Sequence, residues 1–144
     1  MNFPTLASVL AILFAVSTAG AQDPSPRQHA EQFLSGLVSG DTEKAYDRLF
    51  AGSAMADQST RVEAVKRQTA ANLPLYGKPL GYELVMEKTF GTSAVRLLYI
   101  LKTEKHPVVW EFFFYRPKDT WLLANVRFND EFNGLRDSDL PPKT

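Results

Sequence analysis

The part of the chain that decides the fold is its second half, which contains four strand-like runs: YELVMEK, AVRLLYILK, VVWEFFFYR and WLLANVRF, at residues 82–88, 94–102, 108–116 and 121–128. Their aromatic and β-branched residues, and their alternation of apolar and polar positions, are typical of β-strands. The breaks between them are short and contain Gly91, Pro107 and Pro117. Short breaks join antiparallel neighbours, so the sequence predicts a four-stranded antiparallel meander.

Alternate residues of these runs define two different faces of the predicted sheet. One face is almost wholly apolar and should meet the rest of the domain: Tyr82, Leu84, Met86, Val95, Leu97, Tyr99, Leu101, Trp110, Phe112, Phe114, Leu122, Ala124, Val126 and Phe128. The other face mixes charged residues with large apolar ones, among them Leu98, Ile100, Phe113, Tyr115 and Leu123. A solvated face rarely carries so many large apolar groups, so we predict that it is covered by a second copy in a homodimer or by another partner.

Helix signals precede the sheet, and the first is the clearest. Ser25 stands at an N-cap position, Pro26 at the first helical position, and Gln28 three residues after the cap, which together predict a capping box. Gly40 should end this helix.

Two further helices are predicted between residue 41 and the sheet. Asp41 should cap a short helix that runs to about Phe50. Thr60 and Glu63 have the spacing of another capping box, for a third helix that ends before Pro74. Helices followed by a meander predict the α+β class.

The N-terminal residues have the pattern of an export signal. Residues 3–18 are almost all apolar or small, and Ala19-Gly20-Ala21 precedes polar Gln22, as at a signal-peptidase site. We therefore expect a signal peptide at 1–21, a single domain at 22–132 and a flexible tail at 133–144. An uncleaved N-terminal anchor is the alternative. Export without any cysteine favours a periplasmic or secreted protein, with no membrane contact after cleavage.

Charge and composition exclude several functions. Sixteen basic and sixteen acidic residues give zero formal net charge, so the long-range field that nucleic-acid binding needs is missing, and we expect no nucleic-acid partner. With no Cys and only His29 and His106, which we expect to be solvated, no metal site is predicted. We assign no catalytic residue and no cofactor, because the sequence has neither a nucleophile elbow nor a phosphate-binding glycine loop.

Two local patterns resemble the nuclear-transport-factor-2-like superfamily, the cone-shaped fold shared with ketosteroid isomerase. They are GDTEKAY at residues 40–46, which opens the second helix, and DTWLL at 119–123, which leads into the last strand. The resemblance implies three helices packed on the concave face of a curved four-stranded sheet, a pocket between them, and dimers through the other sheet face. It does not select a function, since the superfamily ranges from enzymes to scaffolds.

Four aromatic residues could line that pocket: Tyr46, Tyr99, Trp110 and Phe128. The leading hypothesis is a non-enzymatic exported domain that binds a small apolar ligand or an envelope protein. One alternative is an isomerase- or hydrolase-type enzyme, although the inward face of the predicted sheet offers no Asp, Glu or His as a base. Another is a structural dimeric accessory module. A polar cavity would favour the enzyme, an apolar cavity the binding domain, and a filled interior the accessory module.

Overall fold

The computed structural model describes residues 22–131, so the predicted signal peptide, the tail and Phe132 lie outside the described residues. Helices and strands follow in this order: α1 (Pro26–Ser39), α2 (Thr42–Phe50), α3 (Ser59–Asn72), the 3-10 turn η1 (Leu73–Tyr76), β1 (Pro79–Phe90), β2 (Ala94–Thr103), β3 (Val108–Tyr115) and β4 (Leu122–Asn129). Between residues 22 and 131, no helix is both long and apolar enough to cross a membrane.

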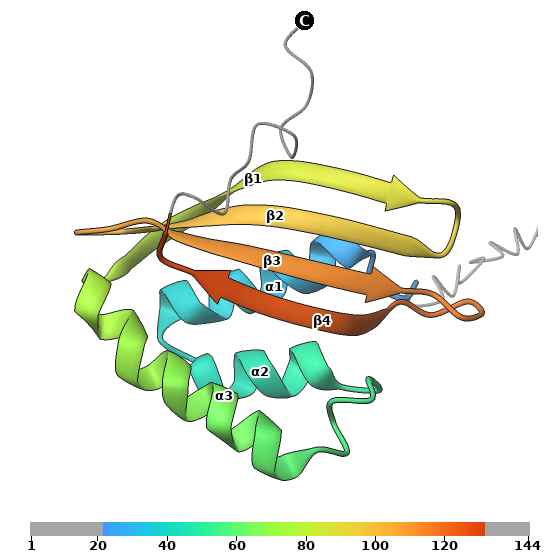
Figure 1. Cartoon of the computed structure of the whole chain (residues 1–144), viewed down its shortest axis with the longest axis horizontal. Helices are drawn as coiled ribbons and strands as arrows, with labels where there is room; N and C mark the ends of the chain where they lie inside the picture. Colours follow the sequence, from blue (N-terminus) through green and yellow to red (C-terminus); the bar gives the residue numbers. More distant parts are fainter. Residues whose placement is uncertain (1–21, 132–144) are drawn as a thin grey trace, which may run out of the picture.

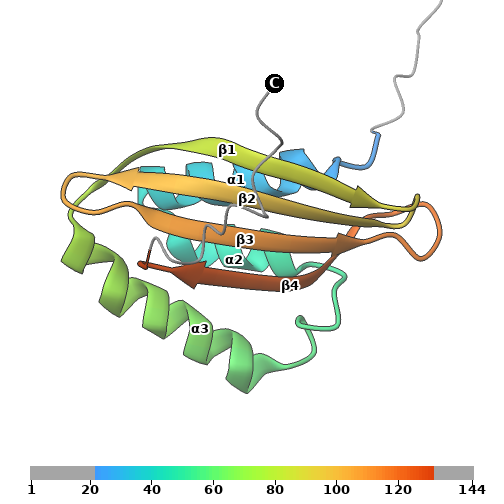
Figure 2. The same cartoon turned by 45° about the horizontal axis from the view of Figure 1, so that its top comes forward.

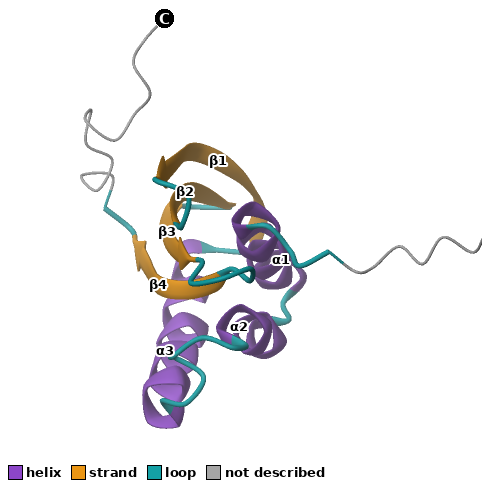
Figure 3. Ribbon diagram, turned by 90° about the vertical axis from the view of Figure 1, so that its right-hand side faces the viewer, coloured by secondary structure: helices purple, strands orange, loops and turns teal. Residues whose placement is uncertain are grey.

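The predicted fold class is confirmed. The strands form one antiparallel sheet in the order β1-β2-β3-β4, and the helices lie on one side of it, as Figures 1 and 2 show. Seen end-on in Figure 3, the sheet curls around α1, and α2 lies beside α1. The other face of the sheet, called the outer face from here on, is covered by no described helix.

The start of α1 forms as the sequence predicts. The Gln28 backbone N–H donates to the Ser25 hydroxyl, and the Ser25 N–H donates to the Gln28 side-chain carbonyl, which completes the capping box. Gly40 ends the helix with a φ of 83°, in the left-handed region that glycine adopts without strain.

The predicted side-chain caps of the next two helices are wrong. Asp41 precedes α2 as expected, but its carboxylate makes no cap hydrogen bond and instead lies 3.7 Å from the Lys44 ammonium. The third helix begins at Ser59, so Thr60 lies within it. The Glu63 carboxylate, which would have closed the box, lies 3.3 Å from the ammonium of Lys66.

The core lies between the sheet and the first two helices. Its largest side chains are fully buried and come from α1, α2, β2 and β3: Trp110, Tyr46, Tyr99, Phe33, Phe50, Phe112 and Phe114. The Phe33 ring meets those of Tyr46 and Trp110 edge-on, with centroids 4.8 and 5.0 Å away. Aromatic rings therefore fill the middle of the domain.

Two register shifts change the predicted faces of the sheet. Between β1 and β2 the register slips between Leu84 and Met86, so Met86 pairs with outer-face Leu98 instead of facing inward. Between β3 and β4 it slips at Phe113 and Phe114, so Leu123 pairs with Phe114 in the core. The assignment of Leu123 to the outer face is therefore wrong. One extra residue in a strand moves every side chain beyond it to the opposite face of the sheet.

The same shift explains a second error in β4. Ala124 was expected to face inward and is exposed, whereas Val126 and Phe128, beyond the bulge, pack against the core as predicted. The inward residues of β2 and β3 are buried as the alternation predicts.

Candidate functional site

The four predicted ligand-binding residues lie on the concave side of the sheet, but most of them are not exposed to a cavity. Tyr46 and Tyr99 are 0 % exposed and Trp110 is 1 % exposed. Only Phe128 is partly exposed, at a surface groove between α3 and β4. Trp110 stacks on Phe128 at 5.0 Å between ring centroids. Ligand binding by these residues stays a prediction, and it would require some of these rings to move.

Each buried phenol in this cluster has a protein partner. The Tyr46 hydroxyl lies 2.6 Å from the Thr69 hydroxyl, and burial raises the pKa of Tyr46 to about 12. The Tyr99 hydroxyl donates to the Glu31 carboxylate at 3.1 Å. Burial and the neighbouring carboxylate raise the pKa of Tyr99 as well. Both phenols are thus neutral hydrogen-bonding groups at ordinary pH.

One buried polar atom in the described chain has no hydrogen-bond partner, the indole Nε1 of Trp110. Its ring lies among the rings of Phe33, Phe112 and Phe128. An indole N–H in such a position costs free energy of about 1–3 kcal/mol relative to a satisfied one.

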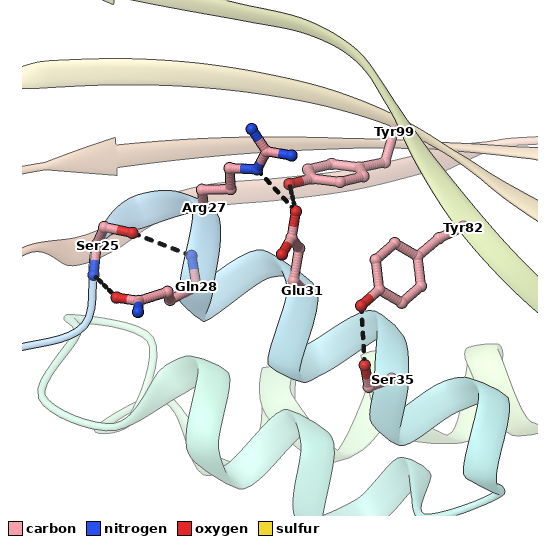
Figure 4. A network of polar contacts seen from close by, with 7 residues as sticks. All are labelled: Ser25, Arg27, Gln28, Glu31, Ser35, Tyr82 and Tyr99. Carbon is pink, nitrogen blue, oxygen red and sulfur yellow. Dashed lines mark hydrogen bonds and ion pairs between the residues drawn. The ribbon is translucent and has the colours of Figure 1, made fainter.

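A polar cluster on the side of α1 was missed by the sequence reasoning (Figure 4). The Oε1 atom of Glu31 accepts two hydrogen bonds, from Arg27 Nε at 2.8 Å and from the Tyr99 hydroxyl at 3.1 Å. One turn further along, the Ser35 hydroxyl pairs with that of Tyr82 on β1 at 3.0 Å. The i, i+4 spacing of Arg27 and Glu31 was a visible signal for their ion pair. The link to Tyr99, 68 residues away, had no sequence signal.

The outer face carries a row of charges across three strands. Glu111 on β3 is paired on one side with Arg96 of β2 and on the other with Arg127 of β4, whose Nη2 lies 2.9 Å from Glu111 Oε2. Both guanidiniums also lie over the Phe113 ring, at 5.8 and 5.5 Å from its centroid. This arrangement is a structural salt-bridge row.

The two histidines lie at opposite ends of β3. His29 stacks on Phe114 at 5.6 Å between ring centroids and is half-buried, so its expected full solvation is wrong. Burial lowers the pKa of His29. The His106 ring nitrogen Nε2 lies 2.6 Å from the Asp130 carbonyl oxygen. In the described part of the chain, no three acidic or histidine side chains gather as metal ligands would.

Comparison with known proteins gives evidence only at the level of structure. No protein-family model and no curated protein matches this chain. It is similar to a solved protein from Campylobacter jejuni, provisionally named an NTF2-like transpeptidase, at 18 % identity and a TM-score of 0.53. That match covers 69 % of this chain and 97 % of the other. An NTF2-like protein of unknown function from Shewanella oneidensis MR-1 matches at 16 % identity and a TM-score of 0.46, over 74 % of this chain and 100 % of its own.

Similarity at this level of identity shows the fold and carries no activity with it. The match to the Campylobacter structure extends over nearly all of that protein's length, and in this chain it takes in three helices and an open antiparallel sheet. The chain therefore has an α+β fold like that of the NTF2-like Campylobacter protein.

Proposed function

We propose that this chain is an exported, non-enzymatic accessory domain that works by binding protein through its outer sheet face, and that its first partner is a second copy of itself. One observation carries this proposal: the interior of the cone is occupied by the protein's own rings. Tyr46, Tyr99, Trp110 and Phe112 are each at most 1 % exposed. Because side chains fill the concave side of the sheet, the outer face is the surface that is best suited to binding.

The outer face has the properties of a self-complementary interface. It carries Leu98, Val109, Ile100 and Phe113, of which the first two are already almost fully buried by their neighbours in the sheet. Tyr115 is 49 % exposed at one end. Aromatic and aliphatic side chains with arginines beside them resemble the composition of protein interfaces.

The charges on this face support burial against a second copy. Glu111 already has both carboxylate oxygens paired with arginines of its own sheet. Covering such a row leaves no isolated carboxylate, so the desolvation cost is smaller than for an unpaired charge. A twofold axis through the face would let the Phe113 rings of the two copies meet.

Export rests on the sequence pattern of residues 1–21 and is part of the same proposal. A native mass spectrum of the full chain, produced with its N-terminal residues and purified from its own compartment, tests every part. A dimer that begins near Gln22 and retains no small molecule supports it. A monomer would overturn the outer-face assignment, an intact N-terminus would overturn cleavage, and a reproducible bound mass would favour a ligand-binding or catalytic domain.

A further inference from the structure

A groove runs between α1 and α2 on the side of the domain away from the outer face. The two helices approach so closely that a Cβ added to Gly36 would lie 2.6 Å from the Cβ of Ala45. These two small residues leave an open groove of about 520 Å³, which Tyr82 of β1 closes on one side. Ligand sites in proteins have volumes of about 300–1,000 Å³, so the groove is large enough for a small molecule.

Most of the residues that line the groove have polar side chains. Apart from Gly36 and Ala45, every lining residue has a side chain that donates or accepts hydrogen bonds: Gln28, Glu31, Gln32, Ser35, Ser39, Asp41, Lys44, Arg48 and Tyr82. The two carboxylates and the two basic groups among them cancel in formal charge. A simple anion or cation would therefore meet a like charge beside each opposite one, and the groove has no net preference for either.

Part of this lining is held in a fixed orientation. Glu31 uses only its Oε1 atom for the bonds from Arg27 and Tyr99, which leaves Oε2 as an acceptor without a partner among residues 22–131. Because Tyr99 is fully buried, its hydroxyl holds the Glu31 carboxylate in one orientation. The Ser35 and Tyr82 hydroxyls hold each other on the same wall. Pre-organised polar groups lose less conformational entropy when a ligand binds.

Both helices also offer hydrogen-bond donors to the groove. Arg48 lines the groove from α2, and Gln28 and Gln32 line it from the N-terminal half of α1. Antiparallel α1 and α2 bring the end of α2, where Arg48 lies, toward the start of α1. A ligand in the groove would thus find a fixed acceptor at Glu31 and guanidinium and amide donors nearby.

We propose that this groove binds a neutral, hydroxyl-rich molecule, a saccharide of one or two rings. Each sugar hydroxyl both donates and accepts a hydrogen bond, so it can satisfy carboxylate, guanidinium and amide groups at once without bringing a charge. A protein segment fits less well, because the groove lacks apolar side chains that would anchor one. The site is separate from the outer face, and its existence does not depend on dimerisation.

The test is an NMR titration of the ¹⁵N-labelled full chain with maltose, N,N′-diacetylchitobiose, glycine and sulfate. Saccharide-dependent shifts at the backbone amides of Gln32, Ser35 and Ser39 are the expected result. Arg48→Ala should weaken binding about tenfold, the change expected for one charge-assisted hydrogen bond. The matched control is Arg61→Ala, which removes an exposed arginine of α3 outside the groove and should leave binding unchanged.

Three results would overturn the proposal. One is the absence of shifts at these amides with either saccharide at about 20 mM, a concentration that saturates sites with Kd near 1 mM. Another is binding of glycine or sulfate in the groove at least as tightly as the saccharides, which would identify a zwitterion or anion site. The third is equal binding by Arg48→Ala and Arg61→Ala with shifts that map elsewhere.

Discussion

Lys66 of α3 and Asp47 of α2 form an ion pair, with 2.7 Å between Nζ and Oδ1, although Lys66 is only 6 % exposed. Glu43 and Glu63 also lie within 3.3 Å of the same ammonium. The hydrogen bond that the Lys66 ammonium donates to the Asp47 carboxylate is the main cause of the raised pKa of Lys66. Since α3 buries only Val62, Lys66 and Thr69 along its length, this ammonium links α3 to α2 together with the hydrogen bond between Thr69 and Tyr46.

Lys66→Met should lower the free energy of unfolding by about 1–3 kcal/mol, because three carboxylates lose the cation between them while the apolar stem is kept. Urea denaturation measures the loss. The matched control is Lys44→Met, since Lys44 is exposed and has one ion pair at 3.7 Å, and it should change stability by less than about 0.5 kcal/mol. Equal effects of the two changes would show that Lys66 does not hold α3.

Phe113→Glu should convert the proposed dimer into a folded monomer. The new carboxylate would lie at the centre of the outer face beside Arg96 and Arg127, which already pair with Glu111, so a second copy would bury an excess negative charge. Light scattering gives the mass, and circular dichroism shows that the fold is kept. Ala71→Glu adds the same charge at an exposed position of α3 and should leave the mass unchanged. A dimer that persists in Phe113→Glu would exclude this face as the interface.

Phe112→Ala should cost about 3–5 kcal/mol of stability, because it removes a fully buried ring from the centre of the core. Phe90→Ala is the matched control, since Phe90 is 46 % exposed at the end of β1 and should lose far less. Chemical denaturation compares the two. A loss no greater for Phe112 than for Phe90 would mean that the strand register is wrong.

Gly36→Ala should destabilise the protein by about 1–3 kcal/mol, since the new methyl group would overlap that of Ala45 and push α1 from α2. The double variant Gly36→Ala with Ala45→Gly moves the methyl group to the other helix and should recover part of the loss. Thermal denaturation of the single and double variants measures the coupling. Purely additive effects would show that the two residues do not touch.

The pH dependence of stability should carry a contribution from His29. Because burial lowers its pKa in the folded protein, the unfolded chain binds more protons in the window between the lowered pKa and the ordinary histidine value of about 6.5. Stability therefore rises with pH through this window and falls on acidification. An NMR titration should give a His29 midpoint below the ordinary value, and His29→Gln should flatten this part of the Tm profile. A midpoint at or above 6.5 would contradict the burial.

Sequence reasoning succeeded where local chemistry was sufficient. Ser25 and Gln28 form the predicted capping box, and the four strands agree with the predicted runs to within three residues at each end. The inward residues of β2 and β3 followed from alternation alone, because those central strands pair with each other without a register shift. Such features depend on the composition of a short stretch of sequence and on the period at which its apolar residues recur.

It failed where the answer depended on distant parts of the chain. Leu123 and Met86 lie on the faces opposite to those predicted, since a bulge is a property of a strand pair and is not visible in one strand. No sequence pattern places Asp47 and Glu43 beside Lys66, because these residues meet only when α2 packs against α3. Glu31 and Tyr99 meet only because the curved sheet brings β2 onto α1.

The register shifts of this sheet fall on its two edge strands, β1 and β4, and the pair β2–β3 between them is regular. Edge strands offer free backbone groups to which another chain can add, and a local irregularity interrupts that template. The outermost strands are therefore poor starting points for endless strand-by-strand growth. Self-association of this protein should stop at a closed pair and should resist the formation of fibres.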